Sequence, residues 1–295
     1  MNNELQIAKK GIILAGGRGT RLYPTTKVVS KLLLPIYDKP TIYYPLSVLM
    51  MAGITDILII SAPDQIFQFE ELLGNGSDIG IRLSYEVQVR PEGIAQAFTI
   101  GEDFIGCDGV VLILGDNFFS GDGLPGVLRK ASLIQSGATI FAVPVSNPRE
   151  FGVVEIDKNG EVLTLEEKPR APKSSHAVPG LYFYDNSVVD VARNLAKSKR
   201  GEYEITDVNL HYLNNKNLSV IKFDSSDIWF DTGTPSALLS ASNYVADTQR
   251  KYGFYIGCIE QIALENHYIG GDQLSELIAK MPDIPYKSYL HECLR

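Results

Sequence analysis

The chain has 295 residues, a formal net charge of −8 at pH 7 and 45% hydrophobic residues. This length and composition allow one large α/β domain with a proper hydrophobic core, either alone or with an appendage. The negative charge argues against nucleic acid as a partner, because non-specific binding to nucleic acid depends on clustered cations.

Neither targeting signals nor disulfides are predicted. Residues 1–10 contain no apolar core long enough for a signal peptide, and no run approaches the roughly 20 apolar residues of a membrane span. Three cysteines without a C-x-x-C pair favour a reducing compartment, and the four histidines lack the spacing of metal ligands. We therefore expect a soluble, cytoplasmic protein that does not bind membranes.

Residues 10–145 alternate between apolar runs that predict strands and segments whose apolar residues recur with helical spacing. The expected strands are 10–15, 56–60, 81–87, 110–114 and 138–145, and the expected helices are 41–52, 64–73, 93–101 and 124–136. The apolar residues of helix 41–52 fall on one face. The alternation predicts an α/β fold with a Rossmann-like, mostly parallel sheet covered by helices on both faces. Ligands bind at the carboxyl edge of such a sheet, where we expect residues 16–21, 88–93 and 115–117 to meet.

After residue 146 the pattern becomes richer in short strands. The expected strands are 151–156, 161–166, 178–184 and 218–223, and the expected helices are 187–197, 205–213 and 236–251. Residues 157–160, Asp-Lys-Asn-Gly, predict a hairpin-like turn between the first two of these strands. From residue 252 onward, short helical segments interrupted by Gly and Pro predict a small helical appendage, 252–295, rather than a separate domain.

The first strand ends in a glycine-rich loop, Gly16-Gly17-Arg18-Gly19-Thr20-Arg21. Glycines without Cβ atoms let backbone N–H groups gather near one point, and such amides beside the cations Arg21 and Lys31 suit a polyphosphate. A simple tight turn is the alternative. The loop is not a P-loop, because Gly-Lys-Ser/Thr is missing, and it is not a dinucleotide fingerprint, because Leu22 stands at the third glycine position.

Two aspartates follow predicted strands. Asp116 ends the most apolar strand, and Asp231 follows two aromatic residues just before a turn and a helix start. Carboxylates at such positions are candidate Mg²⁺ ligands, because hard cations prefer oxygen donors. Each aspartate equally fits a local role, in which its side chain caps the next turn or helix.

Two further polar segments lie at predicted strand ends. In Glu166-Glu167-Lys168-Pro169, the lysine could hold a phosphate as a point charge and a glutamate could accept hydrogen bonds from sugar hydroxyls. A surface charge run is the alternative. Gln88 carries both a donor and an acceptor, which suits the edge of a nucleobase, and its loop continues to Gly93. A solvated loop is the alternative for this segment.

The order of these motifs resembles that of the sugar-nucleotide pyrophosphorylases. Residues 13–22 with Pro24, Ser30-Lys31 and Leu34-Pro35 are similar to their nucleotide loop. Further motifs similar to those of the glucose-1-phosphate thymidylyltransferases are Tyr37-Asp38-Lys39-Pro40, Gly93 to Phe98, Leu114 to Asn117, Phe151 to Glu155, Leu165 to Pro169, Gly180 to Asp185 and Trp229 to Thr234. The resemblance covers residues from about 10 to 250 and is weaker in the tail.

The resemblance implies a reaction in which the phosphate of α-D-glucose 1-phosphate attacks the α-phosphorus of dTTP. Mg²⁺ is the implied cofactor, and dTDP-glucose and pyrophosphate are the products. It also implies a catalytic domain, 1–251, in which residues 10–145 bind the nucleotide and residues 146–251 bind the sugar. A homotetramer with a regulatory nucleotide-sugar site is a further expectation drawn from the family.

The resemblance assigns roles to individual residues. The implied catalytic residues are Arg21, Lys31 and Lys168, and the implied metal ligands are Asp116 and Asp231. The implied nucleotide contacts are Leu14, Ala15, Gly16, Gly17, Gly19, Thr20, Arg21, Gln88, Gly93 and Asp116. The implied sugar contacts are Asn117, Gly152, Glu167, Lys168, Val178, Tyr182 and Trp229.

Four residues depart from the family pattern. Leu32 stands where these enzymes carry Gln, Val89-Arg90 stands where Pro and a small polar residue are usual, and Pro179 stands where Thr is usual. The implied catalytic residues are unchanged, so the departures bear on nucleotide selectivity.

Three other functions are compatible with parts of the pattern. A UTP-dependent or other sugar-1-phosphate nucleotidyltransferase would use the same motifs. A catalytically silent regulatory subunit that binds a sugar nucleotide is disfavoured, because the charged residues assigned to catalysis and metal binding are all present. An NAD-dependent oxidoreductase is disfavoured by the missing third glycine.

Overall fold

The computed structural model describes residues 8–133, 136–224 and 226–295. The strands are β1 (Ala8–Leu14), β2 (Pro35–Ile36), β3 (Lys39–Pro40), β4 (Asp56–Ser61), β5 (Arg82–Val87), β6 (Gly109–Leu114), β7 (Asn117–Ser120), β8 (Ala138–Pro144), β9 (Gly152–Ile156), β10 (Val162–Glu167), β11 (His176–Ala177), β12 (Leu181–Tyr184), β13 (Leu218–Lys222) and β14 (Ile228–Asp231). The α-helices are α1 (Tyr43–Met51), α2 (Ile66–Leu73), α3 (Gln96–Ile100), α4 (Glu102–Ile105), α5 (Leu124–Ser132), α6 (Val188–Arg193), α7 (Ile205–Asn214), α8 (Pro235–Tyr252), α9 (Ile259–Glu265), α10 (Gly271–Lys280) and α11 (Pro285–Cys293).

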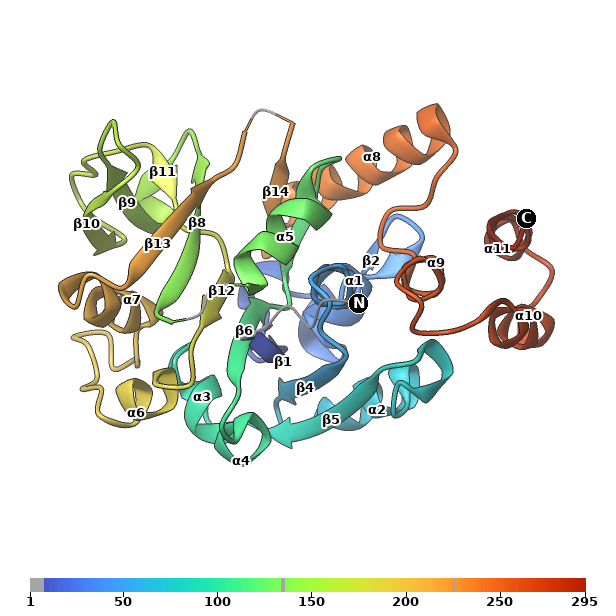
Figure 1. Cartoon of the computed structure of the whole chain (residues 1–295), viewed down its shortest axis with the longest axis horizontal. Helices are drawn as coiled ribbons and strands as arrows, with labels where there is room; N and C mark the ends of the chain where they lie inside the picture. The colour runs from blue at the N-terminus through green and yellow to red at the C-terminus, as the bar shows by residue number, and fades with distance from the viewer. Residues whose placement is uncertain (1–7, 134–135, 225) are drawn as a thin grey trace.

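Within these described ranges, ten strands form one sheet in the centre of the molecule (Figure 1). Their order is β10-β9-β11-β8-β12-β6-β1-β4-β5, with β13 beside β8. Strand β1 is parallel to β4 and β6, and β4 is parallel to β5, whereas β12 runs antiparallel between β6 and β8. The predicted α/β class with a mostly parallel sheet is confirmed.

Alternate residues of the central strands face two separate hydrophobic cores. Ile13 and its register partner Ile113 lie in one core, and Ile12 and its partner Leu112 lie in the other. All four side chains are fully buried. Burial of such a side chain stabilises the fold by about 1.5–3 kcal/mol, so both faces of the sheet must be covered. Helices α1, α5 and α9 cover one face, and α3, α6 and α7 cover the other.

Helix α1 differs from the sequence prediction of a single apolar face, because it is buried on all sides from Tyr44 to Met50. The reason is tertiary: α9, from the C-terminal segment, packs against the side of α1 that the sheet leaves uncovered. A hydrogen bond of 2.9 Å from the Tyr268 hydroxyl to the Met50 carbonyl joins the same two segments. The C-terminal helices therefore share the core of the central sheet.

Two short strands were given no bounds in the sequence prediction. Strands β7 and β14 pair antiparallel and form a separate two-stranded sheet just beyond the carboxyl end of β6. Helix α5 ends at Ser132, and the expected extension to residue 136 includes residues 134–135, which lie outside the described ranges. The β7–β14 pair matters most for function, because it starts next to Asp116 and ends at Asp231.

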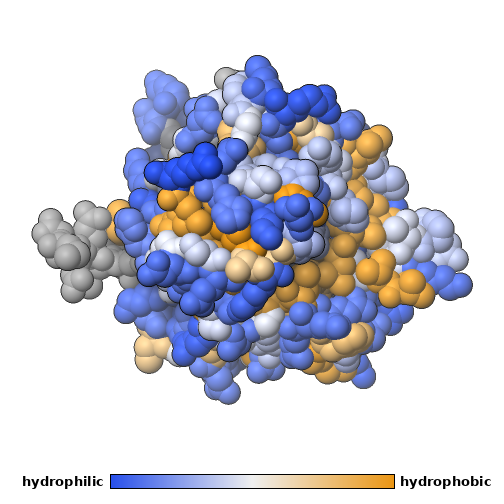
Figure 2. Space-filling view, turned by 90° about the vertical axis from the view of Figure 1, so that its right-hand side faces the viewer, coloured by the Kyte–Doolittle hydropathy of each residue, from blue (hydrophilic) through white to orange (hydrophobic). Residues whose placement is uncertain are grey.

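Figure 2 shows the side of the molecule on which the C-terminal helices lie, where apolar patches interrupt the polar surface. Exposed apolar side chains at the ends of α8 and α11 include Tyr252, Phe254 and Ile284. No helix in the described part of the chain is both long and apolar enough to cross a membrane.

Candidate active site

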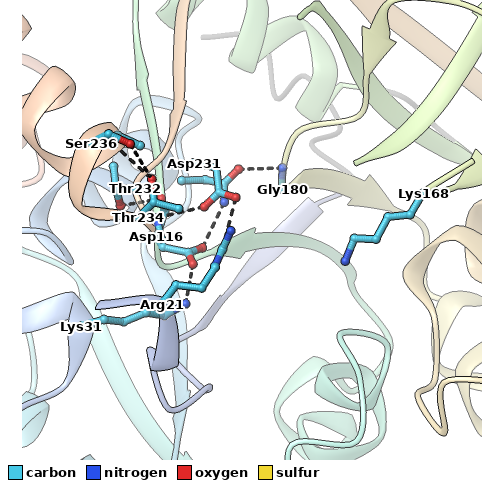
Figure 3. A network of polar contacts seen from close by, with 12 residues as sticks. Arg21, Lys31, Asp116, Lys168, Gly180, Asp231, Thr232, Thr234 and Ser236 are labelled. Atoms are coloured by element: carbon cyan, nitrogen blue, oxygen red, sulfur yellow. Dashed lines mark hydrogen bonds and ion pairs between the residues drawn. The ribbon is translucent and has the colours of Figure 1, made fainter. Parts of the chain in front are cut away.

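The β7–β14 pair brings Asp116 and Asp231 to the same edge of the central sheet. Asp231 is the register partner of Asn117, the residue after Asp116. The backbone N–H and the hydroxyl of Thr232 donate to the Asp116 carbonyl oxygen at 2.9 Å and 2.8 Å. Two carboxylates far apart in the sequence therefore sit side by side at the carboxyl end of β6 (Figure 3).

Each of these carboxylates is paired with a cation from the segment between β1 and β2. The Lys31 ammonium group forms an ion pair with Asp116, and Arg21 Nη2 lies 3.5 Å from Asp231 Oδ2. Gly233 makes room for the second pair, because a Cβ atom at this position would lie 2.3 Å from Arg21 Nη2. The structure thus brings together four of the charged residues that the sequence singles out.

The electrostatics of Asp116 favour its ionised form. Burial by itself raises the pKa of this carboxyl, but the charge of Lys31 and hydrogen bonds from Lys31 and Asn117 outweigh the effect. The net result is an Asp116 pKa below its ordinary value. Asp116 is therefore a charged oxygen donor at neutral pH.

The donor set fits a magnesium ion bound together with phosphate. Mg²⁺ usually binds through one or two protein carboxylates plus waters and phosphate oxygens. Asp116 and Asp231 can supply the two carboxylates. No cluster of three or more His, Cys, Asp or Glu side chains occurs in the part of the chain that the structure describes, so phosphate or water must complete such a site.

Asn117 links this acidic centre to the neighbouring strands. Its Oδ1 accepts hydrogen bonds from Trp229 Nε1 at 2.7 Å and from the Gly180 backbone N–H at 2.9 Å. Its Nδ2 donates to Asp116 Oδ1 at 3.1 Å. Because Asn117 is buried and its amide oxygen accepts two bonds, its visible role is to hold Asp116 in place.

The glycine-rich loop follows β1 and turns over the carboxyl edge of the sheet. Gly17 and Gly19 have φ angles of +92° and +57°, which favour glycine. The loop is held by a 2.8 Å hydrogen bond from the Thr26 hydroxyl to the Gly19 carbonyl oxygen. A Cβ atom at Gly17 would lie 3.8 Å from Lys31 Nζ, so this backbone lies close to the acidic centre.

Three adjoining cavities run along this edge. The first, of about 580 Å³, lies between the glycine-rich loop and residues 62–68. The second, of about 200 Å³, shares Gly16, Gly17, Gln88 and Pro91 with the first and includes Lys31 and Asp116. The third, of about 140 Å³, shares Ile94 and Leu114 with the second. The cavities form one trough at the place where α/β sheets bind ligands.

The third cavity contains the residues that the resemblance assigns to the sugar. Its lining includes Asn117, Gly152, Glu167, Lys168, Val178, Tyr182, Trp229 and Asp231. Glu167 is oriented by the Thr206 hydroxyl, which donates to Oε2 at 2.6 Å, and by Arg200 Nη1, 3.3 Å from Oε1. The Lys168 side chain lines the same cavity and extends toward the acidic centre (Figure 3), with its ammonium nitrogen 3.8 Å from Glu167 Oε1.

Six of the ten nucleotide assignments line the second cavity: Leu14, Gly16, Gly17, Gln88, Gly93 and Asp116. Ala15, Gly19, Thr20 and Arg21 are absent from the linings of all three cavities. Ala15 instead continues the sheet, because its N–H donates to the Ile60 carbonyl oxygen at 2.7 Å.

Several lining residues escape sequence reasoning. Gln65 and Gln68 line the largest cavity, and the Oε1 atom of each is buried without a hydrogen-bond partner among the described residues. Thr206 and Arg200, which orient Glu167, come from the segment around the start of α7. Both residues lie in segments, Arg200-Gly201-Glu202 and Glu204 to Asp207, that also resemble the family, but the sequence assigned neither of them a role in the site.

Comparisons with known proteins agree with this geometry. The family model described as nucleotidyl transferase matches residues 10–248. The glucose-1-phosphate thymidylyltransferase of Neisseria meningitidis is 52% identical over 286 residues, covering 97% of this chain and 99% of that protein. The chain therefore belongs to the nucleotidyl transferase family, and within it to the group of glucose-1-phosphate thymidylyltransferases.

Two solved structures share the fold. A candidate glucose-1-phosphate thymidylyltransferase from Bacillus anthracis, in complex with sucrose, gives a TM-score of 0.75 at 43% identity and covers 81% of this chain and 95% of its own. A UDP-glucose pyrophosphorylase complexed with UDP-glucose gives a TM-score of 0.72 at 25% identity, with coverages of 82% and 99%. The first structure supports the family assignment, and the second shows the same fold in a protein that holds UDP-glucose.

Proposed function

We propose that this enzyme joins dTTP and α-D-glucose 1-phosphate to give dTDP-glucose and pyrophosphate. The observation that carries the proposal is the position of the Lys31–Asp116 and Arg21–Asp231 pairs. Asp116 and Lys31 line the second cavity of the trough, and Asp231 lines the third. A nucleoside triphosphate in the first two cavities and a sugar phosphate in the third would meet at these charges.

The proposed chemistry is a direct displacement. A phosphate oxygen of the sugar phosphate forms a bond to the α-phosphorus of dTTP, and the bond from that phosphorus to the β-phosphate bridging oxygen breaks. This transfer needs positioning and charge neutralisation rather than a side-chain nucleophile. Lys31 and Arg21 neutralise phosphate charge, and Lys168 directs the sugar phosphate. Asp116 and Asp231 would hold Mg²⁺, which when bound neutralises the charge of the departing pyrophosphate.

UTP is the main alternative to dTTP. Leu32 is fully buried, and a Cβ atom at Gly115 would lie 2.2 Å from Leu32 Cδ1. Leu32 therefore packs beneath the floor of the site and offers no polar group to a base. Since one structural relative binds UDP-glucose, dTTP and UTP need direct comparison.

The test is a panel of nucleoside triphosphates and sugar 1-phosphates, assayed with Mg²⁺ by coupled detection of pyrophosphate. We expect the highest kcat/KM with dTTP and glucose 1-phosphate. A higher kcat/KM with UTP would replace the nucleotide assignment but keep the enzyme class. Absence of pyrophosphate release with every pair would contradict the proposed reaction and favour a silent binding subunit.

We further propose that the enzyme works as a homotetramer in the cytoplasm, with a regulatory nucleotide-sugar site. The exposed apolar residues at the ends of α8 and α11 support self-association, and the free cysteines Cys107, Cys258 and Cys293 suit a reducing compartment. We also propose that residues 252–295 are an appendage of the catalytic domain 1–251, because α9 packs on α1. Light scattering coupled to size-exclusion chromatography tests the tetramer, and a monomeric mass would contradict it.

A further inference from the structure

Gln88 is positioned where two of the cavities meet. It follows β5, its side chain is buried, and its backbone N–H donates to the Ser61 carbonyl oxygen at 2.8 Å. It lines both the first and the second cavity. A Cβ atom at Gly16 would lie 2.5 Å from Gln88 Oε1, so this atom faces the start of the glycine-rich loop.

The orientation of the Gln88 amide decides what it offers to a ligand, because its two ends are an acceptor and a donor. Gln96 determines this orientation. The backbone N–H of Glu92 donates to Gln96 Oε1 at 3.2 Å, and a backbone N–H can only donate, so the Gln96 atom at this place must be the oxygen. The same oxygen accepts from Gln88 Nε2 at 2.7 Å. The NH₂ end of Gln88 is therefore engaged, and its oxygen end faces Gly16.

The segment that carries Gln96 is itself fixed by the chain around Tyr203. The Tyr203 N–H donates to the Glu92 carbonyl oxygen at 2.7 Å, and the Ala95 N–H donates to the Tyr203 carbonyl oxygen at 3.3 Å. Gly93 has a φ angle of +120°, and a Cβ atom there would lie 2.4 Å from the Tyr203 carbonyl oxygen. Gln96 therefore has little freedom to move away from Gln88.

We propose that Gln96 is a positioning residue for base selectivity: it keeps Gln88 Oε1 turned toward the nucleobase as a hydrogen-bond acceptor. The inference rests on the proposed function, which puts the base beside Gln88. Thymine and uracil carry an N–H at ring position 3, which can donate to this oxygen. Cytosine carries a lone pair at the same position, so two acceptors would face each other. No described residue donates to Gln88 Oε1, which leaves it available to the base.

The test uses Gln96→Met, which keeps the side-chain length but removes the oxygen, and Gln96→Glu, which keeps an acceptor for both donors. Gln273→Met is the matched control, because Gln273 also joins a helix to a loop through its amide, at Ser77 and Asp78 on a different part of the surface. For each protein we measure kcat/KM with dTTP and with dCTP. Calorimetric Kd values for the same nucleotides give a readout that requires no turnover.

We expect wild type, Gln96→Glu and Gln273→Met to prefer dTTP over dCTP. In Gln96→Met the preference falls by about tenfold, which corresponds to one hydrogen bond, and the change lies in KM and Kd rather than in kcat. The proposal would be overturned if Gln96→Met kept the wild-type ratio of kcat/KM for dTTP to that for dCTP. It would also be overturned if this ratio fell equally in Gln96→Glu. If Gln96→Met does not fold, a fall in the dTTP-to-dCTP ratio in Gln96→Glu would still overturn the proposal.

The calorimetric Kd values distinguish a failure of the Gln96 proposal from a failure of the proposed reaction. Preferential binding of dTTP that depends on Gln96, without pyrophosphate release by wild type, would contradict the reaction and leave the Gln96 assignment standing. Pyrophosphate release by wild type with equal Kd values for dTTP and dCTP would leave the reaction standing and contradict the Gln96 assignment.

Discussion

Asp231 lies directly opposite Asn117 in the antiparallel pair of β7 and β14. This register places the Asp231 carboxylate beside Asp116, while Asn117 donates to Asp116 through its amide. The acidic centre therefore depends on two short strands rather than on flexible loops. Rigid elements hold functional groups more precisely than loops do, and the predictions below follow from this arrangement.

Replacement of Lys31 should reduce catalysis strongly. Lys31→Met removes the cation beside Asp116, and loss of one charge-stabilising group costs about 10²–10³ in kcat, or about 2.7–4 kcal/mol. Lys10→Met is the matched control, because Lys10 forms a similarly buried ion pair with Asp56 outside the trough. Steady-state pyrophosphate release should fall in the first variant and stay near wild type in the second. Equal loss in both would point to a general effect of unpaired charge.

The same ion pair should make stability depend on pH. The Asp116 pKa is lowered in the folded protein, so its contribution to stability is present above the unfolded pKa and is lost as pH falls through the folded value. At pH 7 the free energy of unfolding of Lys31→Met should lie about 1–3 kcal/mol below wild type.

This gap should narrow as pH falls, because the Asp116 carboxyl takes up a proton first in the folded variant, where Lys31 no longer lowers its pKa, and only at lower pH in the folded wild type. Urea unfolding at a series of pH values measures it. A gap that stays constant down to pH 3 would mean that the Lys31–Asp116 pair is not its source.

A methyl group at Gly233 should displace Arg21. The added Cβ of Gly233→Ala would lie 2.3 Å from Arg21 Nη2 and 2.9 Å from Asp231 Oδ1. Because Arg21 is flexible and can swing away, we expect little change in Tm but a fall in kcat/KM of about 10–100-fold. Gly123→Ala is the control, since a Cβ there meets nothing within 4 Å. Unchanged activity in Gly233→Ala would show that Arg21 needs no contact with Asp231.

Lys168 should act on the sugar phosphate rather than on the nucleotide. Lys168→Ala should lower kcat/KM for glucose 1-phosphate by about 10²–10³, by the scale of a lost charge-stabilising group. The Kd of dTTP should change little. Lys173→Ala is a suitable control, because Lys173 is a nearby exposed lysine paired with Glu166 at 3.4 Å. Loss of dTTP binding in Lys168→Ala would show that this lysine binds the nucleotide rather than the sugar phosphate.

The sequence predicted the central sheet because β1, β4 and β6 are apolar on both faces, which a buried parallel sheet requires. It could not predict β7 and β14, because these strands are short and their pairing joins Asn117 to a residue on a distant segment. The one-sided pattern expected for α1 failed for a similar reason, since its second apolar face is covered by α9. Local periodicity does not report contacts between distant parts of a chain.

The candidate site shows the same division. Asp116, Lys31 and the glycines could be picked out because residue type and strand-end position both point to phosphate chemistry. Gln96 and Thr206 lie in segments that resemble the family, but their orienting roles could not be predicted, because those roles depend on the side chains that they contact in the fold.

The most direct test of the central claim is pyrophosphate release from dTTP and glucose 1-phosphate by wild type and by Asp231→Asn, with Mg²⁺ present. Asp231→Asn keeps the side-chain shape but removes the charge that pairs with Arg21. We predict release by wild type and a loss of at least about 100-fold in the variant. Release by Asp231→Asn at the wild-type rate would contradict an active site built on the two aspartates.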